Sequence, residues 1–288
     1  MTELFNSIEN RNFKGLERAI NAGADINAVD EGDNYTPLTF AIDTGDIKYV
    51  NRILKAKPDI NGLVREPYNA YTLILQHFET PLQYALRTNA RPTIVKSLLK
   101  FGANPNIHSR GQESTNDTRT PLILAIQNGN KEIIKALLAA GANVNDTTSK
   151  GYTPLYAVAA TYYNNKEIIL MLLEAGANQN VKINNQTALE YHKEIYESNK
   201  PYNFDEYSYA EQKSMTINST YGQHLVALKI YTQRKEKKQK IINRELDGLQ
   251  QIASIKKLPE DMSHYISSFI DGNPTKYHYN RAITPLKI

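Results

Sequence analysis

Cysteine and tryptophan are both missing from this chain of 288 residues. Without cysteine the chain can form no disulfide, no thiolate metal site and no cysteine nucleophile. It also has no run of about 20 apolar residues, so we expect no transmembrane helix. Its first ten residues include acids and no apolar run, so we expect no ordinary secretory signal peptide. These absences predict a cytoplasmic protein, or one secreted into a host cell's cytosol by another route.

The usual signatures of catalysis and of phosphate binding are missing too. The sequence has no GxxxxGK[ST], GxGxxG, GxSxG or HExxH motif, and its six histidines do not cluster with acids at metal-ligand spacing. The net charge of +4 is too small to indicate a nucleic-acid partner by itself. We therefore expect no catalytic residue, no cofactor, no metal and no nucleic-acid partner. A small enzyme within residues 206–288 is the alternative.

What the sequence does contain is a repeated pair of short helices, clearest at residues 120–145, TPLILAIQNGNKEIIKALLAAGANVN. Thr120 can cap a helix and Pro121 suits its first position, where the missing N–H costs nothing. Gly129 favours the left-handed turn that ends this helix. A second helix is predicted over residues 131–139, with a second glycine turn after it.

Degraded copies of this pattern lie before and after it. A Thr-Pro-Leu start recurs at Thr36, Thr80 and Thr153, and a partial unit ends at Asn27. One helix pair cannot bury its own apolar face, so the repetition predicts a stack of neighbours. The motif TPL-x-x-A … LL-x-x-GA-N-x-N resembles the ankyrin repeat. The resemblance implies an all-α fold, an ankyrin-repeat solenoid of helix-turn-helix units with hairpin loops, plus a helical C-terminal extension.

The spacing of the starts sets the expected domain limits. The resemblance covers residues 1–200, about five to six units, and leaves residues 206–288 as the extension. The repeat period is longer than usual in two places, which predicts insertions at residues 63–78 and 107–118. The first insertion could be a short helix or strand packed on the solenoid edge, or an exposed binding loop. The second has the polar composition of a solvated loop.

One position of the motif differs throughout. Where the family has a histidine that bonds to the capping threonine, this chain has Thr39, Gln83, Ile123 and Tyr156. We expect that side-chain bond to be absent here, and each unit to be somewhat looser as a result.

The resemblance also implies where a partner binds. Ankyrin proteins usually bind other proteins on the concave side, through hairpin tips and first helices, so we expect a protein partner and a monomeric chain. Matching the motif places these residues on that surface: Tyr35, Asp43, Glu79, Arg87, Arg119, Gln127, Tyr152, Tyr162 and Tyr163. The family's hairpin asparagine is also a substrate of an asparagine oxygenase, which makes Asn106, Asn145 and Asn180 candidate hydroxylation sites.

The C-terminal extension carries two further signals. Residues 229–244 hold seven cations and one acid, which could attract phosphates or acidic lipid but more simply form a solvated helix face. Residues 258–270 resemble the start of an F-box helix, as in the tails of poxviral and some bacterial ankyrin proteins. Leu258, Pro259, Ile266 and Phe269 would then dock a ubiquitin-ligase linker protein; in the alternative they cap the solenoid. The chain is thus predicted to be an interaction module or scaffold, acting as an effector-type adaptor.

Overall fold

The computed structural model describes residues 3–30, 32, 34–65, 78–109, 119–158, 166–199, 208, 212, 215 and 219–255. The chain divides into two compact units, Met1–Lys229 and Ile230–Ile288. The boundary that the sequence suggested, at residues 200–206, stays a prediction.

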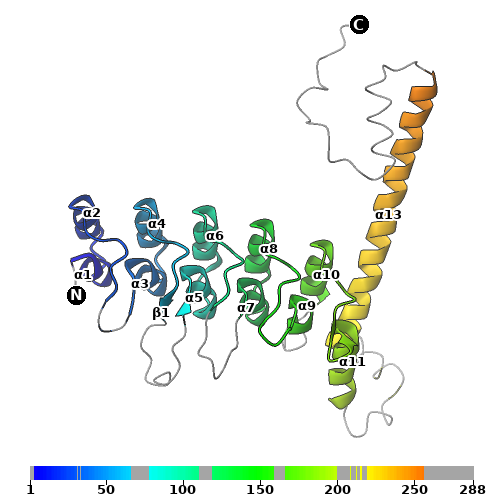
Figure 1. Cartoon of the computed structure of the whole chain (residues 1–288), viewed down its shortest axis with the longest axis horizontal. Helices are drawn as coiled ribbons and strands as arrows, with labels where there is room; N and C mark the ends of the chain where they lie inside the picture. Colours follow the sequence, from blue (N-terminus) through cyan, green and yellow to red (C-terminus); the bar gives the residue numbers. More distant parts are fainter. Residues whose placement is uncertain are drawn as a thin grey trace. The chain divides into compact units, whose positions relative to one another are not determined.

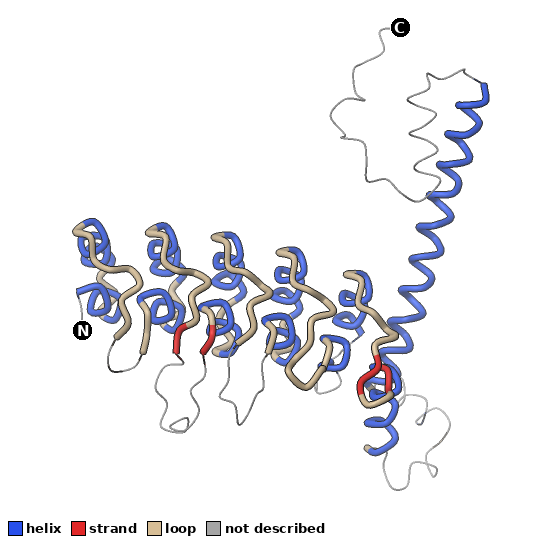
Figure 2. The backbone as a smooth tube through the Cα atoms, viewed as in Figure 1, coloured by secondary structure: helices blue, strands red, loops and turns tan. Residues whose placement is uncertain are grey.

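The first unit is a stack of helix pairs, as the sequence predicted (Figure 1). The first helices of the pairs form one row and the second helices form another beside it (Figure 2). The pairs are α1 (Glu3–Glu9) with α2 (Phe13–Asn21), α3 (Pro37–Asp43) with α4 (Ile47–Lys55), α5 (Pro81–Arg87) with α6 (Pro92–Lys100), α7 (Pro121–Gln127) with α8 (Lys131–Ala139), and α9 (Pro154–Ala157) with α10 (Lys166–Glu174).

Two small antiparallel hairpins interrupt the helices. β1 (Val64–Arg65) pairs with β2 (Phe78–Glu79), in the register Val64 opposite Glu79. β3 (Lys182–Ile183) pairs with β4 (Gln186–Thr187), which leads directly into α11 (Ala188–Ser198). The first hairpin forms the base of the insertion expected at residues 63–78; residues 66–77 lie outside the described residues. Whether that insertion is structural or binds a partner therefore stays open.

The helices begin and end where local chemistry places them. The hydroxyls of Thr36, Thr80, Thr120 and Thr153 each accept a hydrogen bond from the backbone N–H three residues later. Gly129 and Gly141, after α7 and α8, have φ of +66° and +86°. That left-handed conformation is one that residues with a Cβ rarely adopt. The predicted second helix at residues 131–139 is confirmed.

The expected loss of the capping side-chain bond is wrong for two of the four units. The Thr39 hydroxyl lies 3.0 Å from that of Thr36 and accepts from the Thr36 N–H at 2.9 Å. Gln83 Oε1 accepts from both the N–H and the hydroxyl of Thr80, at 2.9 and 3.1 Å. Any side chain with an acceptor at this position can close the capping box, so histidine is not required. Ile123 has no polar atom and leaves its unit without the reciprocal bond.

Close stacking of the pairs depends on small residues. Ala41, Ala85 and Ala125 are fully buried in successive first helices, where a larger side chain would hold neighbouring helices apart. Val158 is the larger residue that the sequence places at this position in the fifth pair, and it is also fully buried. The apolar face that the repeat predicts for each helix pair is therefore part of the core of the solenoid.

The long helix α13 (Thr220–Ile255) begins in the first unit. There Gln223 Oε1 accepts from the Lys166 N–H at 3.1 Å, and Gly222, His224 and Ala227 are buried. The start of α13 thus packs where the stack ends. Residues 232–241 are helical and exposed, as expected of a solvated face.

Several predictions lie outside the described residues. These are Tyr162 and Tyr163, residues 110–118 of the second insertion, and the tail with Leu258, Pro259, Ile266 and Phe269. Both interpretations of that tail, docking and capping, stay predictions.

Candidate functional site

Tyr84 connects two residues that the sequence assigned to the binding surface. It lies in α5, is 2% exposed, and donates its hydroxyl hydrogen to Asp43 Oδ1 of the preceding unit at 2.9 Å. The Tyr35 hydroxyl is 3.5 Å away, and the two tyrosine rings meet edge to face. Burial, followed by the hydrogen bond to Tyr35, raises the pKa of Tyr84, so the phenol stays protonated.

The ion pair of Glu79 and Arg87 adjoins this tyrosine. Arg87 Nη2 lies 2.6 Å from one carboxylate oxygen, and Nε lies 3.1 Å from both. Glu79 is 1% exposed, so the bidentate guanidinium compensates a carboxylate that would be costly to bury alone. The guanidinium also lies 5.2 Å from the centre of the Tyr84 ring. We call Tyr35, Asp43, Glu79, Tyr84 and Arg87 the Tyr84 network.

Sequence reasoning missed Tyr84, the residue at the centre of this network. It occupies a helix position held by Phe40 and Leu124 in neighbouring units. A tyrosine at a buried apolar position needs a partner for its hydroxyl. That requirement was the available signal, although the partner itself is 41 residues away along the chain.

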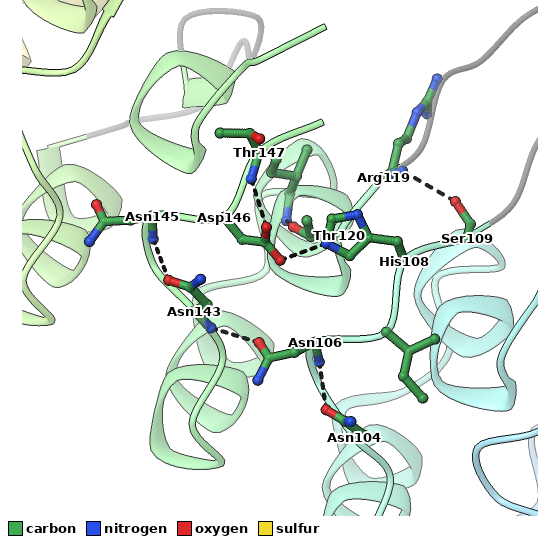
Figure 3. A network of polar contacts seen from close by, with 12 residues as sticks. Asn104, Asn106, His108, Ser109, Arg119, Thr120, Asn143, Asn145, Asp146 and Thr147 are labelled. Atoms are coloured by element: carbon green, nitrogen blue, oxygen red, sulfur yellow. Dashed lines mark hydrogen bonds and ion pairs between the residues drawn. The ribbon is translucent and has the colours of Figure 1, made fainter. Parts of the chain in front are cut away.

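The other predicted surface residues lie farther along the stack. Arg119 and Gln127 are both exposed and approach each other, with Nη1 3.5 Å from Oε1. Figure 3 shows the Arg119 side chain pointing away from the neighbouring hairpins. Tyr152 contacts the Tyr156 ring, with centroids 6.2 Å apart. The structure thus joins four of the predicted residues through Tyr84 and leaves Arg119, Gln127 and Tyr152 outside that network.

The three candidate hydroxylation sites belong to a series of hairpin asparagines, of which Figure 3 shows Asn106 and Asn145. Asn106 Oδ1 accepts from the Asn143 N–H at 2.8 Å, and Asn145 Oδ1 accepts from the Asn178 N–H at 2.7 Å. Their amide groups donate to Gly141 and Gly176 carbonyls. Each asparagine therefore links its hairpin to the next one. Asn180 ends the series: its side chain is exposed and makes no such link among the described residues.

Two histidine contacts were not anticipated. His108 Nε2 lies 2.7 Å from Asp146 Oδ2, which joins the third and fourth hairpins (Figure 3). His192 of α11 and His224 of α13 are both 1% exposed, and their Nδ1 atoms are 3.0 Å apart. Both Nε2 atoms are buried without a hydrogen-bond partner. No local sequence pattern predicts contact between these two histidines, which are 32 positions apart.

Burial controls the charge of the buried histidine pair. It lowers the pKa of His192 to about 3, helped by the neighbouring imidazole and opposed by the backbone carbonyls of Leu155 and Tyr156. Burial also lowers the pKa of His224, to about 4. Both rings are therefore neutral at pH 7, and one can donate to the other. Within the described ranges no group of three or more His, Cys, Asp or Glu side chains could hold a metal ion. Nor is any described helix both long and apolar enough to span a bilayer.

Comparison with known proteins shows to which family this chain of helix pairs is similar. The chain is 43% identical over 76 residues to the glycerophosphocholine phosphodiesterase gde1 of Schizosaccharomyces pombe, covering 26% of this chain and 6% of that protein. It is 30% identical over 154 residues to the putative ankyrin repeat protein YahD of Escherichia coli, covering 44% and 73%. The match to the phosphodiesterase thus spans a small part of that enzyme.

A solved structure is similar as well. A chain in the complex of the predatory endopeptidase Bd0816 from Bdellovibrio bacteriovorus with the immunity protein Bd3460 aligns with a TM-score of 0.51 and 28% identity. The alignment covers 69% of this chain and 94% of that one. The family described as ankyrin repeats (3 copies) matches residues 4–109 and 82–185, which together exceed half of the sequence. The chain therefore belongs to the ankyrin repeat family.

Proposed function

We propose that this protein binds another protein through the surface formed by its first helices and hairpin tips. Ankyrin repeats generally mediate protein–protein interactions, and the solved relative was itself determined in a complex of two proteins. The observation that carries the proposal is the Tyr84 network. It fixes the rings and charges of Tyr35, Asp43 and Arg87 before any partner arrives, which lowers the entropy cost of binding.

The partner-facing residues divide into a fixed group and an adaptable one. The Tyr84 network supplies the fixed group. Arg119, Gln127 and Tyr152 have exposed or half-buried side chains and supply the adaptable group; Tyr162 and Tyr163 stay in the proposal from the sequence alone. Arginine and tyrosine dominate binding hot spots, where truncation costs about 2 kcal/mol or more. Arg119 and Tyr152 are therefore the residues whose truncation tests the surface.

The structure changes which variants are informative. Reversing the charge of Arg87 would place a second carboxylate beside the buried Glu79 and unfold the unit, so loss of binding would reveal nothing. Arg119→Glu combined with Tyr152→Ala keeps the Tyr84 network intact. Capture from lysate by the full chain and by this variant, followed by mass spectrometry, should yield a protein retained only by the wild type. A partner that binds both equally, when purified, would place the interface elsewhere.

Beyond protein binding, we propose a more specific role for the whole chain as an adaptor or effector, in which the C-terminal extension makes the second contact. In that hypothesis the repeats hold a target while residues 258–270 recruit machinery such as a ubiquitin-ligase linker. A chain ending at residue 255 should then retain the target and lose the linker protein in the same capture experiment. Loss of the target as well would favour the capping alternative. No arrangement of described residues favours catalysis, so we do not propose an enzyme.

Asparagine hydroxylation is a second, separate proposal. We expect Asn180 to react more readily than Asn106 or Asn145, since its hairpin is not linked forward through its side chain. Peptide mass spectrometry after co-expression with an asparagine hydroxylase should show oxygen added first at Asn180. Equal modification at all three positions would mean that the side-chain links do not protect the hairpins.

A further inference from the structure

The turn that ends the second helix of the second unit differs from its counterparts in the other four units. After the second helix of the pair, four units place a glycine followed by alanine, at Gly23, Gly102, Gly141 and Gly176. The second unit has Lys57 and Pro58 instead. Lys57 nevertheless adopts the left-handed conformation of the glycines, with φ of +59°. A side chain with a Cβ is strained there, so the turn keeps a lysine at a cost to stability.

A third departure lies in the next unit. The residue before the turn is alanine in four units, at Ala22, Ala56, Ala140 and Ala175, and is Phe101 in the third. The Phe101 side chain lies outside the core, as its exposure of 39% shows. Stability alone would favour alanine at this position, since a large apolar side chain gains little when it faces water.

The structure brings these three departures together around one groove. The groove has a volume of about 430 Å³, is open to solvent on one side, and is lined by Leu54, Lys55, Lys57, Pro58, Ile60 and Phe101. It lies between the ends of α4 and α6, in the row of second helices, whereas the Tyr84 network belongs to the row of first helices (Figure 1). We call it the Phe101 groove. Three residues that break the internal repeat therefore share one surface feature, although they come from two units.

The lining has a distinct chemical character. Leu54, Pro58, Ile60 and Phe101 make its apolar walls, and no carboxylate or amide side chain is among its lining residues. Lys55 and Lys57 are exposed at its rim, and neither forms an ion pair within the described part of the chain. The carboxylate nearest in sequence, Asp59, accepts from the Asn61 N–H at 3.2 Å. The groove thus offers apolar contact with two positive charges beside it.

We propose that the Phe101 groove binds an acidic peptide segment of a partner protein, with one bulky apolar side chain seated between carboxylates. The apolar walls receive the anchor side chain, and Lys55 and Lys57 attract the flanking acids. A groove of this volume matches the size of ordinary ligand sites. Small polar ligands lack the apolar anchor, and a nucleic acid would meet mostly apolar walls. This site is separate from the surface under the proposed function and uses none of its residues.

The test is selection of displayed random peptides on the full chain, with affinities then measured for synthetic peptides by fluorescence anisotropy. Enriched sequences should carry Leu, Ile, Met or an aromatic residue next to Asp or Glu. Phe101→Ala should weaken binding of the selected peptide about tenfold, and so should Lys55→Glu and Lys57→Glu when each is made singly. Lys150→Glu, a lysine outside the groove, is the matched charge control and should leave the affinity unchanged.

The variants are chosen so that a loss of peptide binding can be distinguished from a loss of folding. Phe101→Ala introduces the residue that the other four units carry, and its thermal midpoint should stay near that of the wild type. No enrichment, enrichment of neutral or basic peptides, or unchanged affinity in Phe101→Ala would each overturn the proposal. A peptide whose affinity falls equally with Lys150→Glu would also overturn it, because the attraction would then come from overall charge.

Discussion

Residues that depart from the repeat have opposite surroundings in the Tyr84 network and at the Phe101 groove. In the network, polar side chains at positions near the core are bonded to one another: Tyr84 to Asp43, and Arg87 to the buried Glu79. At the groove, a strained lysine and an exposed phenylalanine gain little from the fold around them. The difference teaches that departures from a repeat fall into two classes. Those satisfied within the chain stabilise it, and those left facing solvent are candidates for binding.

Of the changes that test this comparison, removal of the Arg87 side chain should lower the stability of the fold the most. Arg87→Ala leaves the carboxylate of Glu79 buried without its bidentate partner, so we expect a loss of about 3 kcal/mol in unfolding free energy. Arg119→Ala, at an exposed position, should cost less than about 0.5 kcal/mol. Urea unfolding followed by circular dichroism measures both. Equal effects of the two variants would mean that the network does not stabilise the stack.

Acidification should break the other buried polar pair. The pKa values of His192 and His224 are about 3 and about 4 in the fold, below the ordinary value of 6.5. Docking of α13 therefore contributes its full stability above pH 6.5 and loses it as the pH falls toward 4, since the undocked rings bind more protons. We expect a loss of about 2.7 kcal/mol by pH 5.5, since each of the two rings contributes about 1.36 kcal/mol per pH unit below 6.5. Hydrogen exchange of residues 220–229 measures it.

The pair of His192 and His224 has other titratable groups nearby, so the experiment needs a control variant. Titratable groups near it in sequence or packing include Tyr156 of α9 and four residues of α11: Glu190, Tyr191, Lys193 and Glu194. Glu190 is exposed, and hydrogen bonds from Thr187 lower its pKa. In the double variant His192→Leu with His224→Leu, the protection of residues 220–229, corrected for the intrinsic exchange rate at each pH, should no longer fall between pH 7 and pH 4.5. A fall that persists in the variant would assign the acid sensitivity to other groups.

Deleting one hydroxyl separates the ring of Tyr84 from its hydrogen bond. Tyr84→Phe keeps the buried ring and removes the donor to Asp43, whose carboxylate is exposed and can turn to water. We expect a loss of about 1 kcal/mol, the usual net value of a hydrogen bond. Tyr35→Phe, with its longer 3.5 Å contact, should cost less. The reverse order, measured by thermal unfolding, would place Tyr35 at the centre of the network.

Restoring the repeat at the groove should give the smallest effect, and one of opposite sign. Lys57→Gly places at φ +59° the residue that adopts it without strain, so the thermal midpoint should rise by the equivalent of about 0.5–1 kcal/mol. The same variant should bind the selected acidic peptide less tightly. Destabilisation by Lys57→Gly would show that the turn is not strained and would remove one reason to regard the groove as functional.

The sequence predicted the repeating architecture well because its signals are local. Thr-Pro starts, glycine turns and the apolar stripe act within a few residues, and the helices at 121–127 and 131–139 follow them. The capping bonds of Thr39 and Gln83 are equally local, and they were mispredicted because one residue type was taken as necessary. The contacts of the proposed binding residues were harder to predict, since family matching picked out Arg87 and Asp43 without showing which residues they would contact.

The sequence by itself determined that this chain is a stack of ankyrin helix pairs, because capping residues, glycine turns and apolar periodicity mark where each helix begins, ends and must be buried. Only the tertiary structure decided that Tyr84 would join Asp43, that two buried histidines would meet, and that Lys57 and Phe101 would line one groove. The residues of these three pairs lie 41, 32 and 44 positions apart along the chain. Their geometry depends on how closely the units stack, which the buried alanines and the chain's packing set together.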